Sequence, residues 1–331
     1  MNCEICGCSE NTLISKQIRE GEGRIVRCNQ CGLIFQDAKF SLNQIKQYYN
    51  NEYTKTNSLD SDSIQTPREH FVDRLATLSL SLNKIKEILL DNYKNTSSKI
   101  NILEVGASTG ELLFSIRNEL SDKINIDKTI GIELNSEFCD WANSNLEDID
   151  MIDRDLNEVE FDIKFDFIYS NYTLDHLINP KETLLKMKSL LKKDGIIYLE
   201  LPNRDEALNY YLSPKTQDSY QIFSWHKAHM FYFTCDSITK MMDNIGMDVQ
   251  LDCFHEYSLK NYLNWYFCGT PGKRFEKEIN DVDFFFGDSE FEKEMNELFR
   301  YAEKRFKEIM KTTYSGNTIC VTAKLKGEGH E

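Results

Sequence analysis

The chain has 331 residues, of which 40% are hydrophobic and 28% are charged. This length predicts one large domain with a small appendage, because single domains commonly hold about 100–200 residues. The formal net charge of −15 repels polyanions, so we expect no nucleic-acid partner. The sequence has no apolar run of about 18 residues and no signal-peptide pattern at its start, so we expect a cytoplasmic protein without a membrane span.

Ten cysteines divide into an N-terminal group and five scattered thiols, and the scattered ones suit a reducing compartment. The N-terminal group holds two Cys-x-x-Cys-Gly pairs, with 21 residues between Cys6 and Cys28. In each pair a tight turn directs two thiolates at one tetrahedral ion, and glycine permits the turn. We therefore expect a zinc ribbon over residues 1–37, with a short hairpin between the pairs and Cys8 as a spare thiol. Four-sulfur iron is the alternative to a structural Zn²⁺ held by Cys3, Cys6, Cys28 and Cys31.

The next segment, residues 38–70, is polar and rich in asparagine, which predicts a linker or lid. Its tyrosines (Tyr48, Tyr49 and Tyr53) are expected to pack either on a ligand or on the domain. From Phe71 to Leu89, apolar residues recur at steps of four and three, which predicts one helix face directed at the core.

Apolar strands alternate with helices in the main domain, predicted over residues 71–257 and 313–327. One helix is marked over about 180–193, with Asn179 and Pro180 at its start, Lys192 and Lys193 at its end and Gly195 beyond. This alternation predicts an α/β fold, a mostly parallel sheet with helices on both faces. The seven expected strands cover residues 100–106, 129–134, 149–153, 165–170, 195–200, 247–254 and 317–325.

Residues 258–312 break the alternation and are predicted to form a helical insert before the last strand. The insert is rich in aromatic residues and ends in an amphipathic helix. Such an insert is expected to cap the active site or to form a homodimer contact, and the sequence leaves both open. The apolar face of its last helix comprises Phe291, Met295, Leu298, Ala302, Phe306 and Ile309.

The most informative segment is an apolar strand that ends at Gly106 in a loop of small residues. The loop opens a helix after Gly110, and a second strand ends on Glu133, 23 residues further on. Small residues let a ligand approach the backbone, the helix N-terminus favours a carboxylate, and the acid suits a ribose diol. A dinucleotide loop would need glycines at the positions of Ser108 and Glu111, so the spacing favours another nucleotide cofactor.

Glu104, Gly106 and Gly110 resemble the E-x-G-x-G-x-G motif of class I S-adenosylmethionine (SAM) methyltransferases, with Ser108 in place of the middle glycine. We expect the loop to tolerate Ser108. The resemblance implies a Rossmann-like, mostly parallel sheet of seven strands, the last of them inserted and antiparallel. The resemblance also implies the cofactor residues. These are Glu104 at the ammonium, Gly106, Ala107 and Gly110 where the backbone lies against the ligand, Glu133 and Leu134 at the ribose, Asp155 and Leu156 at the adenine, and Asn171 at the methionine.

Three further segments, 165–177, 198–203 and 226–234, resemble the zinc-ribbon methyltransferases. Among these are sugar C-methyltransferases that act on nucleotide-linked deoxysugars in surface-glycan or natural-product biosynthesis. The resemblance implies a small-molecule acceptor, most specifically a nucleotide-activated sugar. Two departures matter: at 331 residues we expect no room for the further C-terminal domain that those enzymes carry, and their Glu-His pair is Ala228-His229 here.

Histidine suits removal of a proton from the acceptor, because its ordinary pKa is about 6.5. His229 matches the family's base best, and His226, His176 and Tyr232 are further candidates, each of which has a structural role as its alternative. Three other functions stay open: O- or N-methylation of another metabolite, a zinc-ribbon adaptor on a decayed methyltransferase fold, and RNA modification, which the acidic charge disfavours.

Overall fold

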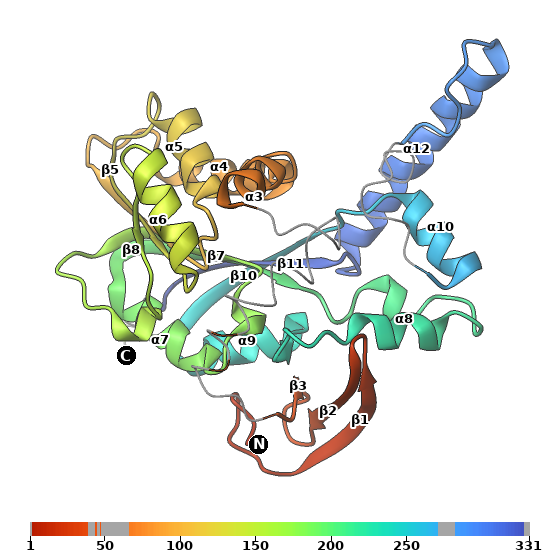
Figure 1. The fold of residues 1–331 in the computed structure, drawn as a ribbon, viewed down its shortest axis with the longest axis horizontal. Helices are drawn as coiled ribbons and strands as arrows, with labels where there is room; N and C mark the ends of the chain where they lie inside the picture. Colours follow the sequence, from red (N-terminus) through yellow and green to blue (C-terminus); the bar gives the residue numbers. More distant parts are fainter. Residues whose placement is uncertain (1, 39–43, 45–46, 48–65, 271–281, 328–331) are drawn as a thin grey trace. The chain divides into compact units, whose positions relative to one another are not determined.

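A computed structural model of the protein describes residues 2–38, 44, 47, 66–270 and 282–327 (Figure 1). The expected tyrosines of the linker, Tyr48, Tyr49 and Tyr53, lie outside the described residues. The chain divides into two compact units, each built from three segments. The first unit comprises Met1–Ala38, Pro202–Ile238 and Leu251–Cys320, and the second comprises Lys39–Leu201, Thr239–Gln250 and Val321–Glu331.

The first unit contains a four-stranded antiparallel sheet at the N-terminus. Its strands, in sheet order, are β1 (Asn11–Ile18), β2 (Gly21–Cys28), β3 (Ile34–Gln36) and β9 (Phe231–Tyr232). The first two strands form the expected hairpin, with Asn11 opposite Cys28. A small core lies on this sheet, because Trp225 and Tyr232 pack against Ile18, Ile25 and Ile34.

The larger of the two sheets in the described residues has seven strands, as predicted. Its order is β10-β11-β8-β7-β4-β5-β6, so the last strand of the chain is inserted between β8 and β10. The pairs from β8 to β6 are all parallel. The strands are β4 (Ile100–Val105), β5 (Ile126–Ile132), β6 (Asp150–Ile152), β7 (Phe165–Asn171), β8 (Leu191–Pro202), β10 (Met247–Phe254) and β11 (Thr318–Leu325).

The helices of the second unit cover this sheet. They are α3 (Pro67–Leu75), α4 (Ser79–Tyr93), α5 (Glu111–Leu120), α6 (Ser136–Asn145) and α7 (Pro180–Leu190). In Figure 1, α3 and α4 lie beside α5, in agreement with their contacts. The apolar stripe from Phe71 to Leu89 is therefore divided between two helices and is not one continuous helix. The break follows α3, where the Thr77 hydroxyl donates to the Arg74 carbonyl at 2.9 Å.

The helix expected over 180–193 is shorter than predicted. α7 ends at Leu190, and Leu191 is already extended, with φ −76° and ψ 141°. The reason is sheet pairing: buried Leu191 lies opposite Phe165 on β7, so β8 begins there. Lys192 then pairs with Asp166 across the strands at 2.7 Å and does not end a helix.

The helices of the first unit are α8 (Gln217–Ser224), α10 (Leu259–Cys268) and α12 (Glu290–Thr312), and α9 (Cys235–Asn244) passes from the first unit into the second. The segment expected as a helical insert thus carries α10 and α12. A capping box between Ser289 and Glu292 starts α12. Within the described parts of the chain, no helix combines the length and apolar character that crossing a bilayer requires.

Candidate functional site

The loop after β4 adopts a conformation that its small residues make possible. Gly106 and Gly110 have φ values of 82° and 78°, in the left-handed region that glycine occupies without strain. The backbone N–H groups of Gly106 and Ala107 both donate to the Ile132 carbonyl, at 2.8 and 2.9 Å. A Cβ atom on Gly106 would lie 2.1 Å from the Thr173 hydroxyl oxygen, so only glycine fits there. The loop is thereby held tightly between the ends of β5 and β7.

Ser108 also lies in the left-handed region, with φ 51°. This conformation explains why related loops carry glycine at the position, since a side chain there adds roughly 1 kcal/mol of strain. The Ser108 hydroxyl lies 3.0 Å from Nε2 of His70 on α3. The His70 ring in turn stacks on Phe138 of α6, with centroids 4.9 Å apart. The loop accommodates Ser108, as expected, and the hydroxyl gains a partner.

Glu133 follows β5 and is the acceptor for three backbone N–H groups. Its Oε2 accepts from Ser108 at 3.0 Å, and its Oε1 accepts from Leu134 and Asn135 at 2.7 and 3.0 Å. Burial raises the pKa of Glu133, and these three hydrogen bonds oppose the increase. A carboxylate offers about four acceptor positions, so this group is fixed in orientation and keeps capacity for one more donor.

Two further acids lie at the loop. Glu104 is buried on β4 and accepts from the Tyr169 hydroxyl at 2.8 Å. Burial and the charge of Glu111 raise the pKa of Glu104 well above its ordinary value. Glu111 accepts from the backbone N–H and the hydroxyl of Thr109 and pairs with Arg74 at 3.2 Å. A cation beside Glu104 would stabilise the ionised form of this carboxyl group.

The remaining predicted cofactor residues follow the neighbouring strands. Oδ1 of Asp155 accepts from the Asn157 backbone at 2.8 Å, and the adjacent Leu156 is buried. Asn171, at the end of β7, donates to Oε2 of Glu200 at 2.7 Å. Residues 104–110, 133, 155 and 171 therefore follow or end adjacent parallel strands at the same edge of the sheet. Ligands of open α/β sheets bind at this edge.

Glu200 was missed by the sequence analysis. It is fully buried on β8, and its carboxylate accepts from Asn171, from the Ser81 hydroxyl at 2.5 Å and from the Tyr198 hydroxyl at 2.6 Å. An acid within the buried run of residues 196–201 was the available signal. Its partner Ser81 lies 119 positions earlier, and no local pattern connects the two.

His226 and Tyr232 have defined hydrogen-bond partners in the first unit. Nε2 of His226 lies 3.0 Å from Glu20 in the β1–β2 turn, and Nδ1 accepts from the Ala228 backbone at 3.0 Å. The Tyr232 hydroxyl accepts from the His226 backbone N–H at 2.9 Å, and its ring packs edge-on against Trp225. Both side chains thus belong to the structure that holds the hairpin.

His229 is half-buried beside these two residues. Its ring centroid lies 5.1 Å from that of His226 and 5.9 Å from that of Tyr232. His176 belongs to the second unit and is buried, with Nε2 3.4 Å from Asp175. Burial lowers the pKa of His176 to about 4 and raises the pKa of Asp175 to about 7.

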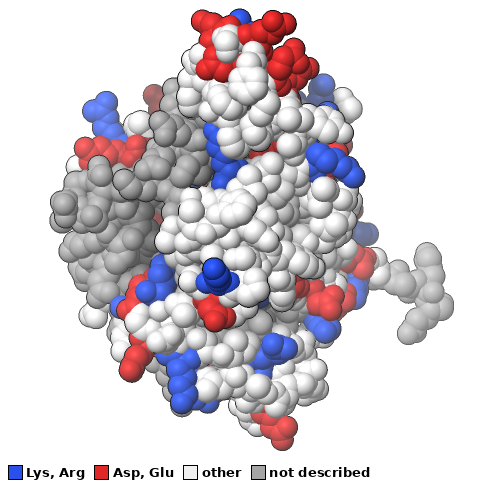
Figure 2. Space-filling model, turned by 90° about the vertical axis from the view of Figure 1, so that its right-hand side faces the viewer, with Lys and Arg blue, Asp and Glu red and all other residues white. Residues whose placement is uncertain are grey.

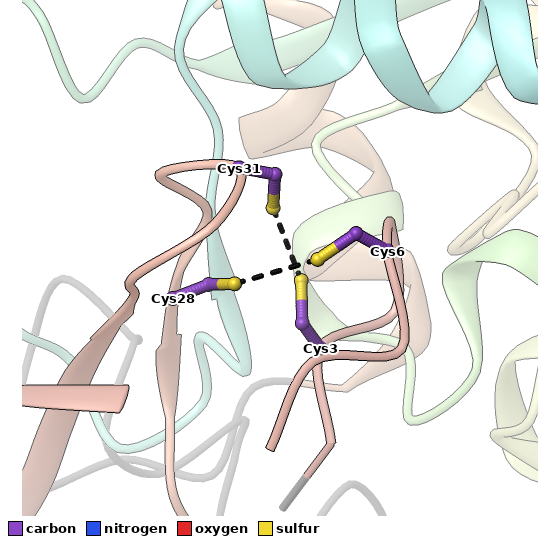
Figure 3. A group of neighbouring side chains, drawn as sticks. All are labelled: Cys3, Cys6, Cys28 and Cys31. Carbon is purple, nitrogen blue, oxygen red and sulfur yellow. Dashed lines mark hydrogen bonds between the residues drawn. The ribbon is translucent and has the colours of Figure 1, made fainter. Parts of the chain in front are cut away.

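The four predicted metal ligands converge at the base of the N-terminal sheet (Figure 3). Sγ of Cys3 lies 3.2 Å from that of Cys31, and Sγ of Cys6 lies 3.5 Å from that of Cys28. All four sulfur atoms lie within 4.8 Å of one another. Cys8 is not in this group, and its thiol contacts the Glu10 backbone.

The glycine after each cysteine pair closes its turn, as the sequence predicted. Gly7 and Gly32 have φ values of 73° and 84°. Their N–H groups donate to the carbonyls of Cys3 and Cys28, at 2.8 and 3.1 Å. Each turn thereby brings two thiols to one side.

The strand order, the glycine loop after β4 and the acid after β5 define the class I fold of SAM-dependent methyltransferases. The family of methyltransferase domains matches residues 73–251, which is more than half of the chain. The chain belongs to this family, and the protein is a SAM-dependent methyltransferase.

No curated protein matched the sequence. Among solved structures, the plantazolicin methyltransferase BpumL in complex with SAH is 16% identical with a TM-score of 0.48, and the match covers 85% of this chain and 94% of that one. Magnesium protoporphyrin IX methyltransferase (ChlM) from Synechocystis PCC 6803 with bound SAH is 10% identical with a TM-score of 0.47, over 65% of this chain and 93% of that one.

Proposed function

We propose that the protein transfers the methyl group of SAM to a small-molecule acceptor, specifically a nucleotide-activated sugar. The observation that carries the cofactor part is the group of Glu104, Glu133 and the Gly106–Gly110 loop at one edge of the sheet. The sugar is supported by the resemblance of residues 226–234 to sugar C-methyltransferases.

The residues at the sheet edge fit the polar groups of SAM. Glu133 has capacity for a ribose hydroxyl, and its three backbone hydrogen bonds hold it in place for that contact. Glu104 suits the ammonium, because a cation stabilises the ionised form of a buried carboxyl. We assign the adenine to Asp155 and Leu156, and the methionine to Asn171 with Glu200 behind it.

Methyl transfer from a sulfonium is an in-line displacement: the acceptor forms a bond to the methyl carbon while the bond from sulfur to carbon breaks. SAM supplies the methyl group and leaves as S-adenosylhomocysteine. The protein positions the two reactants and, for a carbon or hydroxyl acceptor, removes its proton. We assign proton removal to an imidazole.

His229 is our choice for this base. In His226, Nε2 contacts Glu20 and Nδ1 accepts from the Ala228 backbone. The Tyr232 hydroxyl accepts from the backbone N–H of His226, so we assign structural roles to both side chains. Burial of His176 disfavours the protonated form that a base must adopt after it takes the proton. His229 is half-buried and matches the family's histidine.

The four cysteines suit a structural Zn²⁺. A tetrahedral ion with bonds of about 2.3 Å to sulfur holds its ligand atoms about 3.8 Å apart. The separations of 3.2 and 3.5 Å are close to this value, whereas a disulfide would need about 2.05 Å. So small a sheet gains stability from the ion, and we propose that it has no part in the chemistry.

The test is a methyl-transfer assay with labelled SAM and a panel of nucleotide-linked deoxyketosugars. We expect methylation of at least one of them, and His229→Asn should keep SAM affinity while turnover falls about 100-fold or more. Lys227→Asn, an exposed neighbour, is the matched control and should stay active. Methylation of another metabolite class alone would contradict the sugar, and a fully active His229→Asn enzyme would contradict the base.

A further inference from the structure

The long helix α12 has one stripe of residues that packs within its own unit. Asn296 is buried and donates to the Phe285 carbonyl at 2.7 Å, and Phe299 stacks on Phe284 with centroids 3.7 Å apart. Two turns further, Phe306 contacts His255 and Tyr262, with ring centroids 5.3 and 5.5 Å away. Phe306 therefore faces inward and does not share one face with the other predicted residues.

A second stripe runs beside the first and remains on the surface. It consists of Phe291, Met295, Leu298, Ala302, Arg305 and Ile309, at alternating steps of four and three residues. Phe291, Leu298 and Ile309 are 64%, 56% and 44% exposed. Single exposed apolar residues are ordinary, but a continuous stripe at this spacing is the seam of a helix pair. We call this set the outer stripe.

The charges of α12 are divided between its two halves. Residues 290–298 hold four glutamates and one lysine, a net charge of −3. Residues 300–312 hold five basic residues and two glutamates, a net charge of +3. Figure 2 shows acidic side chains gathered at the top of the view, where α12 extends in Figure 1, with mostly uncharged surface and some basic side chains below them. An identical helix is complementary to this pattern only when it runs antiparallel.

We propose that the outer stripe binds the outer stripe of a second copy of this chain in an antiparallel helix pair. A twofold axis near residue 300 places Phe291 against the partner's Ile309 and Leu298 against the partner's Ala302. Arg305, the one charged residue of the stripe, then lies opposite the partner's Met295 and next to the partner's Glu294. The same patch serves both subunits, as closed dimers require.

The first test is the mass of the purified protein in solution, from light scattering. We expect about twice the chain mass of 38.7 kDa at micromolar concentration. Leu298→Glu should give the monomer, whereas Leu185→Glu, an equally drastic change at a 44% exposed leucine on α7, should stay a dimer. Retained SAM binding shows that each variant is folded. A monomeric parent protein, or a folded Leu298→Glu dimer, would overturn the proposal.

The second test distinguishes the direction of the pair. Chains carrying Leu298→Cys are mixed with chains carrying Ala302→Cys and oxidised, with the parent protein as the baseline for its ten native cysteines. The antiparallel register predicts covalent dimers in the mixture well above those of either variant alone. Cross-linking of each variant with itself, without a gain on mixing, would indicate a parallel pair and overturn the proposed register.

Discussion

Glu104 illustrates how one residue can couple the cofactor to pH. Burial, with the charge of nearby Glu111, raises its pKa, so the free protein favours the protonated carboxyl at pH values where an exposed glutamate is ionised. A bound ammonium requires the ionised form. Cofactor binding is therefore expected to release a proton from this residue.

We predict that SAM binds more tightly as the pH rises above the range in which an exposed glutamate ionises, because the raised pKa of Glu104 moves its ionisation upward while the ammonium, with an ordinary pKa of about 8, keeps its proton below that value. Glu104→Gln should weaken binding and flatten this dependence. Calorimetry in buffers of different ionisation enthalpy measures both the affinity and the released proton. Tighter binding at the lower pH would contradict the assignment of the ammonium to Glu104.

At the scale of single residues, the sequence predicted part of the candidate cofactor site. The glycine pattern predicted the loop, and the left-handed φ values of Gly106 and Gly110 are its physical reason. The contact between Ser108 and His70 was not predictable, because the two residues lie 38 positions apart on separate elements. Glu200 was missed for a similar reason, since its network becomes visible only when β7, β8 and α4 are placed together.

At the scale of elements, the N-terminal sheet offers a test of the metal. Two contacts hold the tip of the β1–β2 hairpin. Glu20 lies 3.0 Å from Nε2 of His226, and Nε of Arg19 donates to the Phe223 carbonyl at 2.8 Å. The four cysteine thiols lie together at the other end of the sheet. An ion there would connect the two cysteine turns and secure the end of β2.

We predict about one zinc per chain in the purified protein, measured by elemental analysis. Cys28→Ser should lose the metal and lower the melting temperature, because a three-thiolate site binds zinc more weakly and the sheet has little core of its own. Cys8→Ser is the matched control, since Cys8 lies outside the group, and should keep both. Iron in place of zinc, or equal metal loss in both variants, would contradict the proposed site.

Element boundaries were predicted less well than element types. All seven strands of the large sheet overlap the predicted ranges. The signal was clearest for β4 and β7, because buried parallel strands need continuous apolar sequence. The helix over 180–193 was drawn too long, since Lys192 and Lys193 look like a helix end although Leu191 pairs with Phe165. The turn at residues 76–78 was hidden by an apolar spacing that continues across it.

At the scale of the whole molecule, each compact unit is assembled from three separate stretches of the chain. The first unit contains the N-terminal four-stranded sheet, residues 202–238, α10 and α12. The second contains the Gly106–Gly110 loop and most of the seven-stranded sheet. Periodicity along the sequence reports local elements, and pairings such as β3 with β9 depend on residues nearly 200 positions apart. The grouping was therefore not available from local patterns.

The central claim is that SAM binds at the edge of the sheet formed by the Gly106–Gly110 loop and Glu133. Isothermal titration of the purified protein with SAM and with S-adenosylhomocysteine tests it most directly. We predict binding of one molecule per chain, weakened at least 10-fold in Glu133→Ala and unchanged in Glu137→Ala, an exposed glutamate on α6. Absence of binding by both ligands, or equal affinity in the Glu133→Ala variant, would contradict the account.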